Sequence, residues 1–356
     1  MKKIILTGGG TAGHVTPNIA LLPDLKALGY EIRYIGSYGG IEKELIAKEG
    51  IPYYSISSGK LRRYFSWQNF TDPFRIIRGY FQARSIIKKE KPDVIFSKGG
   101  FVAVPVVFAA KSRKVPVIIH ESDMTPGLAN KLCIPYAQKV CCSFEETLKY
   151  IPEGKAVLTG SPIRRELLSG SREAGFSFTG LDPAKPVILV IGGSLGSVTV
   201  NRAVRDVLPS LLESFGVIHL CGKGNLDPSL NATPGYVQYE YISDQLKDLF
   251  AMADLMISRA GANSICEILA LRKPNILIPL SAAASRGDQI LNANSFKDHG
   301  FSEVIEEEGL SADALLAAVG KVYSGREQYI GAMENAYPGH AINMITGLIE
   351  EAAAKK

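Results

Sequence analysis

The chain has 356 residues, of which 46% are hydrophobic and 21% are charged, a composition typical of a folded globular protein and not of a disordered one. This length suits two domains that each bury a core of their own. No stretch approaches 18 consecutive apolar residues, so no transmembrane helix is expected. The five cysteines form no CxxC pair and are odd in number, which argues against a disulfide framework or a zinc site and fits a reducing cytosol.

The formal net charge of +5 is spread unevenly along the chain. Residues 1–160 carry 23 Lys and Arg against 13 Asp and Glu, whereas the remainder carries 17 against 22. No nucleic-acid-binding motif accompanies the basic half, and its basic residues alternate with apolar ones instead of forming a tail. We therefore expect this half to meet an anionic membrane surface, and we expect no nucleic-acid partner.

The first half repeats a pattern of short apolar strand, glycine turn and helix. The basic and then apolar start predicts a strand at 4–6 and not a signal peptide, because it runs directly into the turn TGGGTAGH at 7–14. A helix is predicted from about Val15 to Leu28, with Pro17 in its first turn, where proline is tolerated. Further strands are predicted at 32–35, 94–96 and 117–119.

The same pattern restarts in the second half. A strand is predicted at 187–191, a turn (GGSLGS) at 192–197 and a helix at 198–212. More strands are predicted at 217–220, 255–257 and 276–278, and an amphipathic helix at about 340–354, whose place the pattern alone does not give. Strands that are apolar on both faces indicate a parallel sheet covered by helices. The sequence therefore predicts an α/β protein with two doubly wound, Rossmann-like domains that meet near residues 160–165.

The turn at 7–14 is the strongest local signal for function in the first half. Glycines after a strand let the backbone approach a ligand, and the next helix points its free N–H groups at an anion. The turn lacks the Lys-Ser/Thr of a nucleoside-triphosphate loop, and no carboxylate follows the second strand to bind a dinucleotide ribose.

His14 lies where the helix after this turn begins. The helix dipole lowers the pKa of a histidine at that position, and a neutral imidazole is what a general base requires. A loop-bracing histidine fits the pattern equally well.

Two further motifs are candidates for holding phosphate. SKGGF at 97–101 is a second glycine turn after a strand, and by itself it is a weak signal. Ser194, in GGSLGS, and the N–H groups that follow it suit a diphosphate. Arg164, in GSPIRR at 160–165, offers a bidentate grip on phosphate, although a surface salt bridge is the commoner role of an arginine.

The last two motifs suit a nucleotide sugar. Glu267 lies in SRAGANSICE at 258–267, which opens a helix, and its carboxylate suits two ribose hydroxyls or simply complements the helix dipole. Gln289 and Asn292, in SRGDQILNAN at 285–294, carry amides that suit sugar hydroxyls but are also ordinary residues at the start of a helix.

Residues 60–91 hold nine Lys and Arg against two Asp and Glu, and many of the residues between them are aromatic or aliphatic. This mixture indicates an interfacial surface. A helix with a solvated basic face explains much of the pattern, but explains less well why nearly all the charges share one sign. The chain contains no Asp-x-Asp, which argues against a nucleotide-bound cation held by paired carboxylates.

Taken in this order and at these spacings, the motifs resemble those of the MurG family, the bacterial UDP-N-acetylglucosamine:lipid I N-acetylglucosaminyltransferases. The resemblance runs over nearly the whole chain and includes HESD followed by GLANK within 120–131. It implies the GT-B fold, in which the parallel sheets of two Rossmann-like domains face each other across a cleft. The implied domains are an acceptor- and membrane-binding domain at 1–163, a UDP-sugar-binding domain at 164–337, and a helix at about 338–356 that packs back on the first domain.

The resemblance also implies site residues. The donor set, to which Asn292 is added for its amide, is Thr11, Ala12, Gly13, Arg164, Ser194, Ile242, Ala262, Asn263, Ser264, Ile265, Cys266, Glu267, Gln289 and Asn292. Within it, Glu267 would bind the ribose, Gln289 the sugar hydroxyls, and Ile242 would lie by the uracil. The acceptor diphosphate would meet Gly10, Gly99 and Gly100, and the general base would be His14, with Glu121 as its rival.

Two positions depart from the family pattern. Asp123 stands where the family commonly has an asparagine that contacts the donor sugar, so Asp123 is left out of the donor set. Ala12 stands where glycine is common, and a methyl group is tolerated there if φ is negative.

The expected reaction is a single inverting displacement. A base deprotonates the 4-hydroxyl of the N-acetylmuramic acid in lipid I, the oxygen attacks the anomeric carbon of UDP-N-acetylglucosamine, and UDP leaves with its charge held by Arg164 and the turn at 192–197. The products are lipid II, a precursor of peptidoglycan, and UDP. We expect no cofactor and no metal site, and the sequence leaves open whether a divalent cation stimulates the reaction.

The expected location is the cytoplasmic face of the bacterial membrane, as a peripheral protein, with cell-wall and division proteins as candidate partners. The main alternative is an enzyme of the same fold that glycosylates diacylglycerol. A membrane-bound scaffold without activity is a second alternative, against which the intact glycine turns, Arg164, Glu267 and Gln289 argue. A nicotinamide oxidoreductase is a third, against which the missing ribose carboxylate argues.

Overall fold

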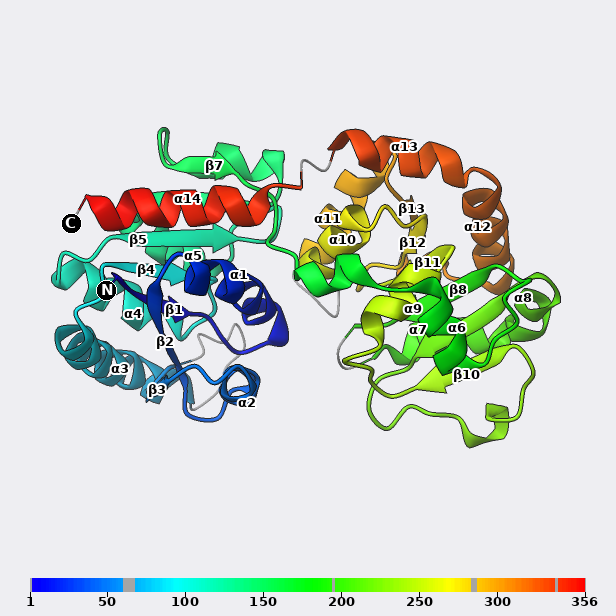
Figure 1. The fold of residues 1–356 in the computed structure, drawn as a ribbon, viewed down its shortest axis with the longest axis horizontal. Coiled ribbons are helices and arrows are strands. Elements are labelled where there is room, and N and C mark those ends of the chain that lie inside the picture. Colours follow the sequence, from blue (N-terminus) through cyan, green and yellow to red (C-terminus); the bar gives the residue numbers. More distant parts are fainter. Residues whose placement is uncertain (1, 60–67, 194–195, 283–286, 337–338, 356) are drawn as a thin grey trace. The chain divides into compact units, whose positions relative to one another are not determined.

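The structure is a computed structural model that describes residues 2–59, 68–193, 196–282, 287–336 and 339–355 (Figure 1). The chain divides into two compact units. Unit 1 comprises Met1–Arg164 together with His340–Lys356, and unit 2 comprises Arg165–Gly339.

Unit 1 is built on a sheet whose described strands are all parallel and lie in the order β3-β2-β1-β4-β5-β6-β7. The strands are β1 (Lys2–Thr7), β2 (Tyr30–Ser37), β3 (Tyr53–Ile56), β4 (Val94–Ser97), β5 (Val117–Glu121), β6 (Lys139–Cys142) and β7 (Ala156–Leu158). The helices are α1 (Thr16–Ala27), α2 (Ile41–Lys48), α3 (Gln68–Glu90), α4 (Ala103–Ser112), α5 (Leu128–Cys133) and α14 (Ala341–Ala354). The strands predicted for this half are confirmed, and so is the first helix, which carries Pro17 in its first turn.

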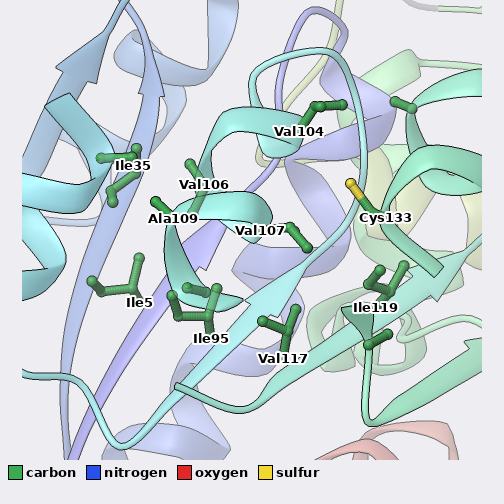
Figure 2. Close-up of a cluster of buried hydrophobic side chains, with 14 of the residues drawn as sticks. Ile5, Ile35, Ile95, Val104, Val106, Val107, Ala109, Val117, Ile119 and Cys133 are labelled. Atoms are coloured by element: carbon green, nitrogen blue, oxygen red, sulfur yellow. The ribbon is translucent and has the colours of Figure 1, made fainter. Parts of the chain in front are cut away.

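Helices cover both faces of this sheet because its strands are apolar on both faces. Successive side chains of a strand point to opposite sides. Ile5 therefore packs in a core that α3, α4 and α5 share, which includes Val106 and Cys133 (Figure 2). Ile4 and Leu6 pack in the core on the other side, together with residues of α1, α2 and α14.

The C-terminal helix α14 completes the second of these cores. It lies beside α1 and over β4 and β5 (Figure 1). Ile342, Ile345 and Ile349 recur at helical spacing and are buried against the sheet. The amphipathic pattern predicted this helix, and the structure shows that its apolar face belongs to unit 1.

Unit 2 repeats the design with described strands that are all parallel and lie in the order β10-β9-β8-β11-β12-β13. The strands are β8 (Val187–Ile191), β9 (Gly216–Leu220), β10 (Tyr236–Tyr239), β11 (Leu255–Ser258), β12 (Asn275–Leu277) and β13 (Glu303–Val304). The helices are α6 (Arg172–Thr179), α7 (Val198–Asp206), α8 (Leu208–Ser214), α9 (Leu246–Met252), α10 (Ala262–Ala270), α11 (Asp288–Asp298), α12 (Ala312–Ser324) and α13 (Arg326–Ala336). Residues of α7, α8 and α12 pack with Ile188 and Val190 of β8 in one core.

The single helix predicted at 198–212 is wrong, because the segment forms two helices that meet at Val207. Pro209 lies at the start of α8 and has no N–H to donate, and its ring would clash with the carbonyl of Arg205 in a continuous helix. The predicted strand at 187–191 is confirmed, and those at 217–220, 255–257 and 276–278 agree with β9, β11 and β12 to within a residue or two.

Among the described residues, no helix combines the length and the apolar character needed to cross a membrane.

The packing of α14 predicts that unit 1 depends on the last residues of the chain. Replacing Ile345 by alanine should lower the free energy of unfolding by about 2–5 kcal/mol, because the change removes buried contacts and leaves a cavity. Urea denaturation followed by circular dichroism measures this. The neighbouring Met344, which is 38% exposed, is the matched control, and Met344→Ala should cost no more than about 0.5 kcal/mol. Equal losses in the two variants would contradict the packing described.

Candidate active site

In unit 1, the motifs TGGGTAGH, SKGGF and HESD meet at one edge of the sheet. They follow β1, β4 and β5, which are neighbours in the parallel sheet, so their carboxyl ends lie side by side. Gly100 has a left-handed backbone (φ 80°), and a Cβ atom there would lie 2.2 Å from the carbonyl oxygen of Gly9. Glycine is therefore required for the first two loops to approach this closely.

A buried carboxylate supports the first glycine loop. Glu42, in the first turn of α2, has no exposed surface and accepts hydrogen bonds from the backbone N–H groups of Gly10 (3.2 Å) and Ser37 (3.0 Å). On the same loop, the Tyr34 hydroxyl donates to the carbonyl of Gly8 at 2.7 Å. These two side chains hold the backbone of the loop in place, and neither was predicted from the sequence to have this role.

His14 is half-buried and ends a short 3-10 turn, Ala12–His14, two residues before α1 begins. Its Nδ1 lies 2.9 Å from the hydroxyl of Thr11. Because a hydroxyl both donates and accepts, Thr11 can orient the imidazole in either neutral tautomer. Of the predicted donor residues in this loop, Thr11 is exposed, and Ala12 and Gly13 are half-buried.

Glu121 is buried at the end of β5 and braces the loop that follows. Its carboxylate accepts hydrogen bonds from Asp123 N (3.0 Å), Gly127 N (3.1 Å) and the Asn130 side chain (2.8 Å). Burial, and then the negative charge of Asp123, raise the pKa of Glu121 above its usual range, although these hydrogen bonds oppose the rise. Asn130 also lies below Gly99, whose added Cβ would come within 3.0 Å of the Asn130 Oδ1.

A lysine and a histidine are buried together beside these loops. The Lys98 Nζ lies 2.7 Å from the His120 Nδ1 and donates to the Ser122 hydroxyl. The Nε2 of His120 lies 2.9 Å from the carbonyl of Gly160, which can only accept, so His120 carries its proton on Nε2. Its bare Nδ1 then accepts from Lys98. Burial, and then the charge of Lys98, hold the pKa of His120 well below its ordinary value of 6.5.

Arg164 is the last residue of the first segment of unit 1. Ser161, Pro162 and Ile163, which precede it, are buried, and Arg164 itself is half-buried. Its Nε is buried and makes no hydrogen bond to any atom of the described residues. A buried donor without a partner is costly, and an anionic ligand would satisfy it.

In unit 2, the turn GGSLGS leads from β8 into α7. Gly196 has a left-handed backbone (φ 76°), and a Cβ there would lie 2.0 Å from the carbonyl oxygen of Cys221. Ser197 caps α7, since its hydroxyl accepts from the backbone N–H of Val200 at 3.3 Å. Ser194, the residue predicted to hold the diphosphate, lies outside the described residues.

The run predicted to bind the nucleotide forms the start of α10. Asn263, Ser264 and Glu267 are half-buried and share one face of the helix at spacings of three and four, whereas Ile265 and Cys266 are buried. The buried members, with Ala262, therefore offer their backbone and not their side chains. Glu267 lies in the second turn, where the helix dipole acts weakly on a side chain, so the dipole does not account for it well.

The remaining predicted residues of unit 2 lie in different surroundings. Gln289 is half-buried in the first turn of α11, and its Oε1 accepts from Leu280 N at 3.0 Å. Asn292 has no exposed surface and its amide is directed at the carbonyl of Ala260 at 3.4 Å, so it supports the loop before α10 and does not present its side chain. Ile242 is half-buried in the loop after β10.

The comparisons with known proteins cover both units. The model of the glycosyltransferase family 28 N-terminal domain matches residues 4–142, and that of the family's C-terminal domain matches residues 187–347. This chain belongs to glycosyltransferase family 28.

Curated relatives match along the whole family 28 chain. The protein from Lachnospira eligens is 66% identical, and the match covers 99% of this chain and 99% of that protein. The protein from Lachnoclostridium phytofermentans is 64% identical, and the match covers 100% of both chains. Both are named UDP-N-acetylglucosamine–N-acetylmuramyl-(pentapeptide) pyrophosphoryl-undecaprenol N-acetylglucosamine transferase. The crystal structure of MurG from Acinetobacter baumannii has a TM-score of 0.76 at 25% identity and covers 99% of this chain and 100% of that one. The predicted family resemblance and the GT-B fold are confirmed.

The sequence motifs of this family 28 chain marked the loops but not the residues that support them. Glu42 lies in an ordinary helix start, and Lys98 and His120 stand inside quoted motifs without a role assigned to either. The signal that could have identified Lys98 and His120 is a charged or imidazole side chain next to a run of apolar residues at the end of a strand. Among the described residues, no group of three or more His, Cys, Asp and Glu side chains is placed to hold a metal ion.

The pKa of His120 predicts how the stability of this family 28 protein depends on pH. The unfolded imidazole takes up a proton as the pH falls below about 6.5, whereas the folded one does not. The unfolded state then binds more protons, so the free energy of unfolding decreases as the pH is lowered. In His120→Asn, the free energy of unfolding should decrease less steeply between pH 6.5 and 5, because unfolding then takes up one proton fewer. Urea denaturation at several pH values measures this slope. The same slope in the wild type and the variant would refute the prediction. Nitrogen-15 NMR should independently show His120 as the neutral Nε2–H tautomer over this range.

Proposed function

We propose that this protein transfers N-acetylglucosamine from UDP-N-acetylglucosamine to lipid I, the undecaprenyl-diphosphate-linked acceptor, to give lipid II and UDP in peptidoglycan synthesis. The observation that carries the proposal is 66% identity, over 99% of the chain, to a protein named for this transfer. The match covers 351 residues and therefore spans both units. In this proposal unit 1 binds the acceptor and the membrane, and unit 2 binds the donor.

His14 is the proposed general base. The Thr11 hydroxyl, 2.9 Å from Nδ1, can accept a hydrogen bond from Nδ1–H, which favours the tautomer whose Nε2 can take the proton of the acceptor 4-hydroxyl. Glu121 is the weaker candidate, because its carboxylate is buried and already accepts three hydrogen bonds from its own loop. The oxygen of the acceptor then attacks the anomeric carbon in a single inverting step.

Positive groups and backbone N–H groups are proposed to hold the leaving diphosphate. Arg164 supports this role with a buried Nε that has no partner among the described residues. The N-termini of α7 and α10 favour an anion through the positive end of the helix dipole. Glu267 and Gln289 are proposed for the ribose and the sugar hydroxyls.

The acceptor diphosphate is proposed to lie against the touching loops of unit 1. Gly10, Gly99 and Gly100 all have left-handed backbones, with φ of 91°, 87° and 80°. Without a Cβ, such glycines let the backbone approach a ligand closely, although the N–H groups of Gly10 and Gly99 already donate to Glu42 and to the Ser97 hydroxyl. No cofactor and no metal are part of this proposal.

The proposed reaction predicts that UDP is released only when donor and acceptor are both present. His14→Ala should lower kcat by about 10² to 10⁴, since it removes the base, while donor binding is retained. A coupled UDP-release assay with UDP-N-acetylglucosamine and a short-chain lipid I analogue measures this. His340→Ala, at an exposed histidine, is the matched control and should keep full activity.

Two outcomes of this assay would contradict the proposal. UDP release that does not require the lipid I analogue, or equal release with UDP-glucose and diacylglycerol, would favour the glycolipid enzyme. Full activity of His14→Ala would remove His14 as the base and leave the reaction itself standing.

We further propose that α3 docks this protein on the anionic, cytoplasmic leaflet of the membrane. Phe74, Ile77 and Phe81 recur at helical spacing and are 74%, 54% and 62% exposed. Arg75 and Arg78 are exposed beside them. The cytoplasmic leaflet carries the negative surface potential that such a surface requires. Residues 60–67 of the predicted basic and aromatic stretch lie outside the described residues.

Vesicle sedimentation tests this docking surface. The wild-type protein should bind vesicles that contain phosphatidylglycerol and should bind neutral phosphatidylcholine vesicles more weakly. Arg75→Glu with Arg78→Glu should abolish binding to the anionic vesicles, because each basic residue contributes about 1 kcal/mol near such a surface. Arg202→Glu, at an 83% exposed position of unit 2, is the control and should bind as wild type does. Unchanged binding of the α3 variant would refute the proposal.

A further inference from the structure

A single buried guanidinium holds the carboxyl edge of the unit 2 sheet. Arg259 directly follows β11 and is 7% exposed. Its Nε and one Nη2 hydrogen are directed at the Ser197 hydroxyl, at 3.1 and 2.7 Å. Its Nη1 donates to the carbonyls of Ile278 and Pro279, both at 3.1 Å, and the second Nη2 hydrogen goes to Glu307 at 2.6 Å. All five N–H donors of the side chain are thereby used.

Glu307 extends the connection to a further loop. Its second carboxylate oxygen accepts from the backbone N–H of Ser281 at 3.0 Å. Burial acts to raise the pKa of Glu307, but the hydrogen bonds from Arg259, Ser281 and Thr199 outweigh it and lower the pKa below its usual range. The carboxylate therefore stays ionised beside Arg259 at neutral pH.

These contacts join the loops after four neighbouring strands, β8, β11, β12 and β13. Ser197 caps α7 at the end of the GGSLGS turn. Arg259 itself precedes α10 by three residues. The carbonyl of Pro279 is followed by Leu280, whose N–H bonds to Gln289. The three elements proposed to bind the donor are thus tied to one ion pair, and neither of its members is among the residues assigned to the donor.

Stability alone explains this arrangement poorly. A buried ion pair loses much of its Coulomb attraction to desolvation, so it contributes little net stability compared with apolar packing. A guanidinium whose five donors are directed at four fixed acceptor atoms does, however, set the mutual positions of the loops that supply those acceptors.

We propose that the ion pair of Arg259 and Glu307, called the Arg259–Glu307 pair below, positions the donor-binding loops of unit 2. By holding these loops in place, the pair sets the affinity of unit 2 for the uridine diphosphate part of the donor. The inference rests on the proposed function, and goes beyond it by assigning residues that do not touch the substrate.

The same sheet provides a matched control at its opposite edge. Arg172 and Asp254 form a two-pronged ion pair, with both Nη–Oδ distances 3.0 Å. Asp254 also accepts from the N–H of Val187, the first residue of β8, so this pair lies at the amino ends of the strands. It has the chemistry of the Arg259–Glu307 pair without its contact with the donor loops.

Isothermal titration calorimetry with UDP on the full-length chain tests the inference. Arg259→Lys and Glu307→Gln should each weaken UDP binding roughly ten- to a hundredfold, because small displacements of binding groups are costly. The double variant should be no weaker than the weaker single variant, since both changes break the same link. Arg172→Lys should bind UDP as wild type does. In the transfer assay, the KM for UDP-N-acetylglucosamine should rise in the first two variants while the KM for the acceptor stays unchanged.

The outcomes separate this inference from the proposed function. Variants of the Arg259–Glu307 pair that fold, by circular dichroism, and bind UDP as tightly as wild type would overturn the inference alone. An equal loss of UDP affinity in Arg172→Lys would also overturn it, because the effect would then follow general destabilisation. Failure of the wild-type chain to bind UDP would overturn the proposed function and this inference with it. If Arg259→Lys does not fold, Glu307→Gln, which keeps the side-chain shape, decides between these results.

Discussion

A parallel sheet leaves the loops at its carboxyl edge without partners from the sheet itself, and buried polar side chains must supply those partners. Each loop there has backbone N–H and C=O groups that are removed from water yet lie beyond the last strand hydrogen bond. In both units the loops that carry the functional motifs are at this edge. The geometry of the site therefore depends on a few buried charged residues that satisfy these backbone atoms.

Both units use carboxylates that accept from loop N–H groups, as Glu307 does for Ser281 in unit 2, and unit 2 also uses a guanidinium. In unit 1, carboxylates accept from loop N–H groups: Glu42 holds Gly10 and Glu121 holds the loop after β5. In unit 2, the guanidinium of Arg259 donates to loop carbonyls and to a serine hydroxyl.

The sequence allowed most of the framework to be predicted, because strand and helix periodicities are local. The apolar runs that end in glycine gave strands such as β1 and β8 closely. The segment 198–212 was predicted as one helix and not as two, because the helical spacing of its apolar residues continues through Pro209. The helical hydrogen bonding of the backbone cannot continue through a proline. The family motifs marked the loops, and the roles that they imply for single residues stay predictions.

The supporting residues could not be predicted in the same way, since their partners are distant backbone atoms. Glu42 and Gly10 are 32 residues apart, and Arg259 and Glu307 are 48 apart. Nothing in the sequence near Glu42 distinguishes it from a glutamate that merely starts a helix. The amphipathic pattern of α14 shows that it has an apolar face but not which core that face joins, and only the family resemblance implied that the helix packs on the first domain.

The position of α14 also has a consequence for the order in which the protein folds during synthesis. Unit 2 is one continuous segment, so all of its residues are translated before the final helix. The core of unit 1 that contains Leu21 and Phe96 is closed by Ile345 and Ile349, which are translated after the whole of unit 2. Unit 1 therefore begins translation first but cannot close this core until unit 2 has been made, so the order in which the halves begin translation does not set the order in which their cores are completed.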